Sequence, residues 1–252
     1  MCRLFLWLAG TLALGWVVQA AESVDLSHSR WTRLLATHVK NGEVDYAALK
    51  AAPQDLQAYL DSLAAVTRPE FDAWPEADQI AFLLNLYNAA TLKLVADHYP
   101  VKSIKDIGGL FGNPWKLKVV RLWDRLITLD DVEHGTLRAD YQEPRIHFAL
   151  VCAARSCPPL RSEAYVGQRL NAQLQDQGRI FLADRAKNRV DPAGQTLWLS
   201  PIFKWFQEDF TANGKTVAEF VLPFLPAAEI SGVSPKDFKV RYTDYDWSLN
   251  RR

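Results

Sequence analysis

The sequence has little cysteine, no excess charge of either sign and no glycine-rich phosphate loop. Its 252 residues contain 29 Lys and Arg and 29 Asp and Glu, so the formal net charge is zero. This balance argues against nucleic acid as a partner, because nucleic-acid-binding proteins usually present an excess of base. Without a phosphate-binding fingerprint or an internal repeat, we expect no cofactor and one continuous architecture.

The one long apolar run stands at the N-terminus, from Leu4 to Val18, and follows Arg3. It has about 15 residues, fewer than the ~20 that a membrane-spanning helix needs. The small residues around Ala20 suit a signal peptidase. The pattern predicts a signal peptide over residues 1–20 and an exported protein, periplasmic or secreted. No integral membrane segment is expected after cleavage, and an uncleaved anchor is the alternative.

The sequence contains three cysteines. Cys2 would leave with the signal peptide, so Cys152 and Cys157 remain. In an oxidising compartment they can form a disulfide. A loop this short would contribute at or below the low end of the typical ~2–4 kcal/mol. Alternatively, one of the two thiols is a nucleophile, and the sequence leaves both interpretations open.

Apolar patterning and turn signals predict the elements. Helices are expected over residues 29–39, 53–63, 76–98, 128–138, 169–186 and 216–225, with another starting at Ser200-Pro201. Hairpins are expected over 116–129 and 189–199, and extended segments over 43–49, 145–151 and 239–246. Together these elements predict an α+β fold, a helix-rich single domain with a buried central helix packed on a small, mostly antiparallel sheet.

The segment 76–98 is apolar on nearly every side, which predicts a helix buried in the middle of the domain. Asn85, Asn88 and Thr91 follow one another at i,i+3 spacing, so they share one stripe of that helix. Buried amides without partners cost several kcal/mol. The stripe therefore faces the backbone of a neighbouring loop, a water or a functional site.

Five motifs stand in order along residues 70–215. They are FLLNLYNA (82–89), HYPVKSI (98–104), DDVEH (130–134), HFALVCAARSCPPL (147–160) and FKWFQEDF (203–210). Together they resemble the domain of unknown function 547 (DUF547), in its bacterial exported form. The signal pattern, the predicted elements and the resemblance together divide the chain into residues 1–20 (signal peptide), 21–68 (N-terminal helical lead-in), 69–215 (DUF547-like core) and 216–252 (C-terminal helix and strand completing the domain).

The DUF547 family carries no established reaction. Its bacterial members are commonly exported, and its plant members carry the domain behind a coiled-coil segment. Some plant members have serine at the position of Cys157 but keep cysteine at that of Cys152. The resemblance therefore favours Cys152 as the nucleophile over an obligatory disulfide. By analogy of fold alone, a buried helix against a small sheet is also compatible with a papain-like or transglutaminase-like core.

A nucleophilic Cys152 needs a base within hydrogen-bond reach. On a regular strand, His147 and Cys152 would point to opposite faces. Either the chain bends between them, or His134 is the base. An asparagine such as Asn85 could orient the histidine. Arg155 could lower the pKa of the thiol, or lie solvated in its turn.

A metal-dependent hydrolase is one alternative, with His134, His147 and either Glu133 or Asp130 as ligands. The segment Asp130-x-x-Glu133-His134 has aspartate where the inverted zinc-protease motif has its first histidine, which makes the signal weak. A second alternative is a non-catalytic periplasmic binding or assembly module with a structural Cys152–Cys157 disulfide.

The leading hypothesis is an exported, thiol-dependent hydrolase or acyl transferase that acts on an amide or thioester of a small-molecule or peptide substrate. The following residues are the candidates. Those for catalysis are Cys152, His134, His147 and Asn85, and those for binding are Asn88, Glu133, Arg155 and Cys157. No metal is included in this set.

Overall fold

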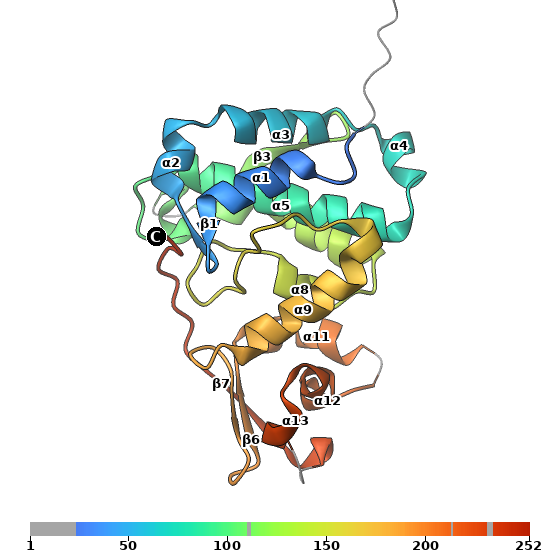
Figure 1. The fold of residues 1–252 in the computed structure, drawn as a ribbon, viewed down its shortest axis with the longest axis vertical. Coiled ribbons are helices and arrows are strands. Elements are labelled where there is room, and N and C mark those ends of the chain that lie inside the picture. Colours follow the sequence, from blue (N-terminus) through green and yellow to red (C-terminus); the bar gives the residue numbers. More distant parts are fainter. Residues whose placement is uncertain (1–23, 110–111, 213, 231–233) are drawn as a thin grey trace, which may run out of the picture.

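The computed structural model describes residues 24–109, 112–212, 214–230 and 234–252 (Figure 1). The predicted signal peptide and Cys2 lie outside these residues. Within the described ranges, no helix is long and apolar enough to cross a membrane. The fold is helix-rich α+β with small, mostly antiparallel sheets, which confirms the predicted fold class.

Helix α5 (Glu76–His98) is the buried central helix, with the predicted bounds. Sixteen of its 23 residues are buried, so it contacts neighbours on almost every side. Each Leu or Phe that leaves water in this way contributes ~1.5–3 kcal/mol. The helix ends before Pro100 because proline disfavours helical backbone in the residue that precedes it, and Tyr99 is extended.

Four shorter helices and a small hairpin precede α5. They are α1 (Ser29–His38), β1 (Val39–Lys40), β2 (Glu43–Val44), α2 (Tyr46–Ala51), α3 (Gln54–Ala64) and α4 (Arg68–Asp72). The predicted extended segment 43–49 was wrong beyond Val44. The Asp45 carboxylate accepts a hydrogen bond from the Ala48 N–H, and this N-cap starts α2 at Tyr46. Helices α2 and α3 both pack on α5.

The predicted hairpin and capped helix follow α5. The elements are η1 (Ile104–Asp106), η2 (Pro114–Lys116), β3 (Lys118–Leu122), β4 (Arg125–Thr128), α6 (Leu129–Val132), η3 (Glu133–Leu137) and α7 (Arg138–Asp140). Strands β3 and β4 are antiparallel. Thr128 and Asp131 form a capping box at the start of α6. The next five residues form a π-helical turn, a geometry common at functional sites.

The segment predicted as a strand over 145–151 is instead the short helix α8 (Ile146–Ala149), and this prediction was wrong. The His147 N–H donates to the Pro144 carbonyl and the Leu150 N–H to that of Ile146, so the chain makes a helical turn. A short apolar run has no periodicity that separates a buried strand from a buried helix. Strand alternation therefore does not separate His147 from Cys152.

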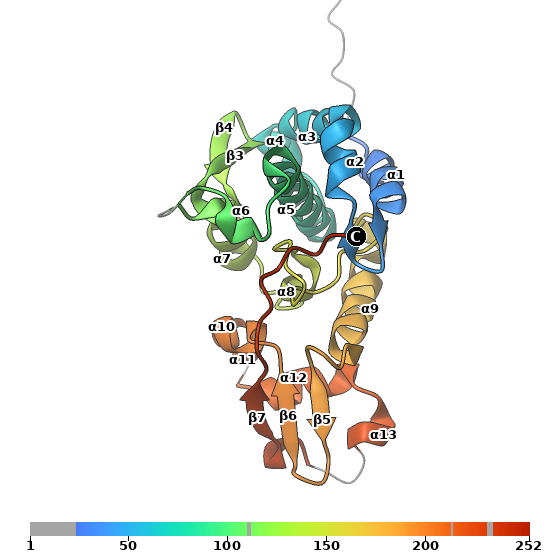
Figure 2. The same cartoon turned by 90° about the vertical axis from the view of Figure 1, so that its left-hand side faces the viewer.

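A second hydrophobic cluster forms below α8 (Figure 2). Its elements follow η4 (Gly167–Arg169) and are α9 (Leu170–Ala183), β5 (Arg189–Asp191), β6 (Thr196–Leu199), α10 (Ile202–Trp205), α11 (Gln207–Thr211), α12 (Val217–Val221), η5 (Leu222–Phe224), α13 (Ala227–Ile230), η6 (Pro235–Asp237) and β7 (Lys239–Tyr242). Strand β6 pairs antiparallel with β5 and parallel with β7. Phe148 is buried in this cluster, while its neighbour Ala149 packs in the first, so α8 joins the two.

The last eight residues, Tyr245–Arg252, form a C-terminal strap that runs from β7 back to the N-terminal helices (Figure 2). Arg251 makes a parallel bridge with Val44. Along the way, the Arg155 N–H donates to the Ser248 carbonyl at 2.8 Å. The strap thereby fixes the turn that follows Cys152.

Candidate active site

The residues after α8 line a pocket of about 200 Å³. Its walls come from α5, η2, η3, α8, α10 and the C-terminal strap. Five of the predicted site residues lie on it, namely Glu133, His134, His147, Cys152 and Cys157. The pocket therefore brings together residues that are far apart in the sequence.

Asn88 holds the chain between the histidine and the cysteine of this pocket. Its side-chain amide donates to the Ala149 carbonyl at 3.0 Å and accepts from the Val151 N–H at 3.0 Å. The amide thus satisfies two buried backbone groups just after α8 and fixes the bend there. Of the three interpretations of the polar stripe, a tether for a neighbouring loop is confirmed for Asn88. Its predicted binding role becomes one of positioning.

The Cys152 thiol is half-buried and is surrounded by hydrogen-bonding groups. The hydrogen bond with the Cys157 thiol lowers its pKa against the opposing effect of burial, and the Tyr245 hydroxyl, 3.1 Å from Sγ, acts in the same direction. Burial raises the pKa of Cys157 and of Tyr245 well above their ordinary values. Both neighbours therefore keep their protons; the Tyr245 hydroxyl can donate to the Cys152 sulfur, while the Cys157 thiol donates to the Leu150 carbonyl.

Both thiols are free in the structure. Cys157 is buried, and its Sγ accepts the Cys152 N–H at 2.9 Å. Ala153, which follows Cys152 in the sequence, has a left-handed φ of 58° and is fully buried. Left-handed backbone is uncommon for a residue with a Cβ, and such residues concentrate at functional sites.

His147 is the histidine with a carboxylate partner. Its Nε2 lies 2.6 Å from Asp209 Oδ2, and its ring stacks on Phe206 at 3.9 Å between centroids. Arg138 donates to both oxygens of Asp209, at 2.6 and 2.8 Å. Although burial opposes it, the hydrogen bonds from Arg138 and His147 hold the pKa of Asp209 well below its usual range. The ionised Asp209 fixes the tautomer with a proton on Nε2, which leaves Nδ1 as the basic nitrogen.

Asp209 was missed by the sequence reasoning. The residue stands in the FKWFQEDF motif of the DUF547 resemblance, which was the available signal. No spacing rule connects it with a histidine 62 positions earlier. The two meet because α11 packs beneath α8.

His134 lies on the pocket but is exposed. Its Nδ1 is 3.1 Å from Arg138 Nη1, and a guanidinium can only donate, so this nitrogen accepts. The hydrogen bonds of the described residues give His134 no carboxylate partner, in contrast to His147. Glu133, the neighbour of His134 in the sequence, is buried and lines the pocket. Burial raises the pKa of Tyr87, and Glu133 raises it further.

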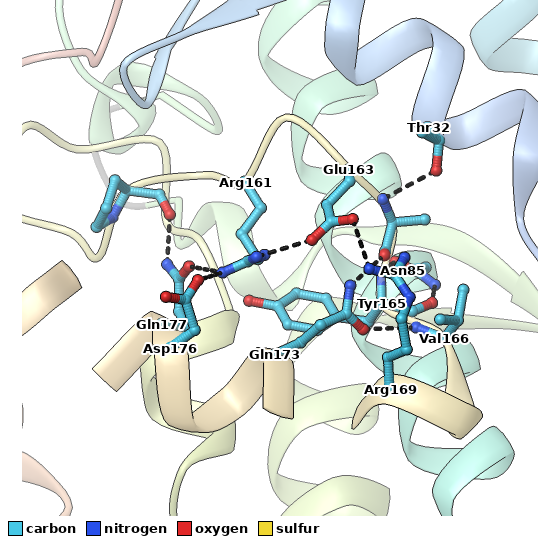
Figure 3. A network of polar contacts seen from close by, with 12 residues as sticks. Thr32, Asn85, Arg161, Glu163, Tyr165, Val166, Arg169, Gln173, Asp176 and Gln177 are labelled. Carbon is cyan, nitrogen blue, oxygen red and sulfur yellow. Dashed lines mark hydrogen bonds and ion pairs between the residues drawn. The ribbon is translucent and has the colours of Figure 1, made fainter. Parts of the chain in front are cut away.

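Asn85 does not lie on the pocket. Its amide donates to the Tyr165 carbonyl at 2.7 Å and accepts from the Tyr165 N–H at 3.0 Å, within the polar network of Figure 3. The amide is thus engaged by a loop on another side of α5. The prediction that Asn85 orients a catalytic histidine is wrong, because Asp209 takes that place on His147.

Arg155 also lies outside the pocket. Its side chain is 57 % exposed, 4.0 Å from the Glu43 carboxylate, and lines a separate surface depression. At this exposure the pair contributes little. The interpretation of Arg155 as a solvated turn residue agrees with this position, and the lowered pKa of Cys152 has other causes.

The residues of the metal hypothesis all lie on the pocket, and each of the two histidines has one ring nitrogen engaged and one free among the described residues. Asp209 holds Nε2 of His147, and Arg138 holds Nδ1 of His134. Over the described ranges, no group of three or more His, Cys, Asp or Glu is arranged to hold a metal ion. The donor set therefore does not fit the predicted zinc site.

Fold and site together define a helix-rich α+β protein with a thiol and a histidine on one pocket, and with a carboxylate that holds this histidine from outside the pocket. The model of the family described as "Protein of unknown function, DUF547" matches residues 71–182, within the predicted DUF547-like core. Cys152 and His147 fall inside the match, whereas Asp209 and Tyr245 follow it. Neither the curated proteins nor the solved structures gave a match.

Proposed function

We propose that the pocket is the active site of a thiol-dependent hydrolase or acyl transferase that acts on an amide or thioester. The supporting observation is that His147, which lines the same pocket as Cys152, is paired with the carboxylate of Asp209. A thiol with a lowered pKa, a histidine and a carboxylate that orients it are the three groups that nucleophilic catalysis needs.

His147 is the proposed base, in preference to His134. The carboxylate of Asp209 stabilises the imidazolium that forms when His147 takes up a proton. His134 has no carboxylate partner among the described residues, and its Nδ1 is already engaged by Arg138. Of the two bases that the sequence left open, the surroundings therefore favour His147.

In the proposed reaction, Cys152 transfers its proton to Nδ1 of His147 and its sulfur attacks the carbonyl carbon. A C–S bond forms, and the carbonyl π electrons move to oxygen. When they return, the C–N or C–S bond to the leaving group breaks, and His147 gives its proton to that group. Water or another acceptor then attacks the thioester while His147 removes its proton, and Cys152 leaves as thiolate.

The test is hydrolysis of a panel of acyl thioesters and anilides by natively purified protein. We expect turnover by the wild type and by Cys157→Ser, and its loss in Cys152→Ala with an unchanged circular dichroism spectrum. Equal turnover by folded Cys152→Ala would contradict the proposal. A complete Cys152–Cys157 disulfide in the native protein would instead favour a binding module.

A further inference from the structure

One wall of the pocket is built from aromatic rings. We call it the aromatic wall, and its members are Trp115, Trp205, Phe206, Tyr245 and Trp247. Trp247 is in the middle: its ring centroid lies 4.6 Å from that of Tyr245 and 5.8 Å from those of Trp115 and Trp205. The rings form one continuous apolar surface next to Cys152.

The outer part of this surface is open to solvent. Trp205 is 48 % exposed, although it lies beside Tyr245 at 4.8 Å and stacks on Trp247 with an interplanar angle of 24°. An exposed large aromatic side chain at a concave site marks a ligand surface more often than a packing defect. A ligand that covers Trp205 would remove this apolar area from water.

The aromatic wall is held in place before any ligand binds. The C-terminal strap carries Tyr245 and Trp247, and it is fixed to the turn after Cys152 by the Ser156 N–H, which donates to the Asp246 carbonyl. Lys105 covers Trp247 with its ammonium 3.5 Å from the ring centroid. A rigid surface binds without the entropy loss of ordering its side chains.

The Asp and Glu side chains that line the pocket, Asp130 and Glu133, discriminate against anions. The nearby Lys105 ammonium lies over the ring of Trp247 and is not part of the lining. Asp130 and Glu133 form no ion pair with the described residues, whereas the charge of Arg138 is matched by Asp209. Glu133 is buried, so its field is only weakly screened. A carboxylate on the ligand would be repelled by these two side chains, while a neutral group would not.

From these contacts we infer that the aromatic wall binds a neutral, apolar acyl or aryl-acyl group, the part of the substrate on the carbonyl side of the scissile bond. This inference rests on the proposed function, since it assigns the substrate class of the same site. Each CH₂ that leaves water strengthens binding by up to about fourfold. The enzyme therefore discriminates against short acyl groups and against those that end in a carboxylate.

The experiment measures binding to folded Cys152→Ala protein, which requires no turnover. The probes are N-methylacetamide, N-methylhexanamide and the isosteric amide with a terminal carboxylate. We expect the hexanamide to bind at least tenfold more tightly than either of the others, and Trp205→Ala to reduce that ratio severalfold. Trp198→Ala is the matched control, because Trp198 lies outside the pocket with Arg189 over its ring.

Equal affinity for the short and long amides, tighter binding of the carboxylate, or an unchanged ratio in Trp205→Ala would overturn the inference. These outcomes leave the proposed function intact if Cys152 is still required for turnover. Conversely, selective binding of the hexanamide by a protein that turns over equally well without Cys152 would uphold the apolar site and refute the thiol mechanism.

Discussion

His147 Nε2 and Asp209 Oδ2 lie 2.6 Å apart, and Arg138 holds the same carboxylate from its other side. This arrangement fixes the ring and the tautomer of a histidine that shares a pocket with Cys152. The histidine–carboxylate contact is the strongest single indication of chemistry in the molecule.

Replacement of Asp209 by asparagine tests this contact. Without the carboxylate, the imidazolium loses its counter-charge and the tautomer is no longer fixed, so we expect turnover to fall roughly 100-fold or more. Steady-state kinetics with a thioester substrate would measure the loss. Glu208→Gln is the control, because Glu208 is an exposed acid of the same helix. A similar loss in both variants would point to disturbance of α11 instead.

The lowered pKa of Asp209 also predicts a pH dependence of stability. A carboxyl group whose pKa is lower in the folded chain stabilises the fold fully above its unfolded value of about 4, and less as the pH falls toward the folded value. The difference in unfolding free energy between wild type and Asp209→Asn should therefore be constant above about pH 5 and shrink as the pH falls below about 4. Urea unfolding at several pH values measures it, and a difference that stays constant at low pH as well would refute the contact.

The reactivity of the two thiols should differ. The Cys157 hydrogen bond lowers the pKa of Cys152, while burial raises that of Cys157, so iodoacetamide should modify Cys152 first at neutral pH. In Cys157→Ala, the alkylation of Cys152 should need a higher pH than in the wild type. Peptide mass spectrometry after timed alkylation gives both results.

Faster modification of Cys157, or a pH profile unchanged in Cys157→Ala, would contradict this account of the thiol pair. Failure of both cysteines to react until a reductant is added would show a disulfide in the native protein. In that case the pair would be structural, and the nucleophile assignment would fall.

Asn88→Ala should destabilise the fold and disturb the site together. It leaves the Ala149 carbonyl and the Val151 N–H without a partner in the interior, at a cost of about 2–4 kcal/mol in unfolding free energy. Asn85→Ala is the matched control, because it removes two equivalent bonds to Tyr165 away from the pocket. We expect both variants to lose stability but only Asn88→Ala to change the alkylation rate of Cys152.

The elements that the sequence predicted best are those with a local signal. Helix α5 was predicted to the residue because it is apolar on every side and stops before Pro100. The segment 145–151 was predicted wrongly because a short buried run lacks periodicity, and the turn after Pro144 decided its conformation.

The residues of the candidate site also divide into those that a local sequence motif contains and those that only the packing of the chain brings in. His147, Cys152 and Cys157 belong to one motif, so the sequence could name them together. Asp209 and Tyr245 reach His147 and Cys152 from α11 and the C-terminal strap, 62 and 93 positions along the chain from these partners. Contacts of this kind depend on the packing of the whole chain, and no local pattern contains them. Asn85 and Asn88 share one helical stripe, but different loops pack on them.

The most direct test of the thiol mechanism is to trap the acyl-enzyme. The protein is mixed with an apolar acyl thioester, quenched in acid and mapped by mass spectrometry. The account predicts one acyl group on Cys152 in the wild type and in Cys157→Ser, none in Cys152→Ala, and much slower acylation in His147→Ala. Acylation at another residue, or an equal rate without the His147 imidazole, would contradict it.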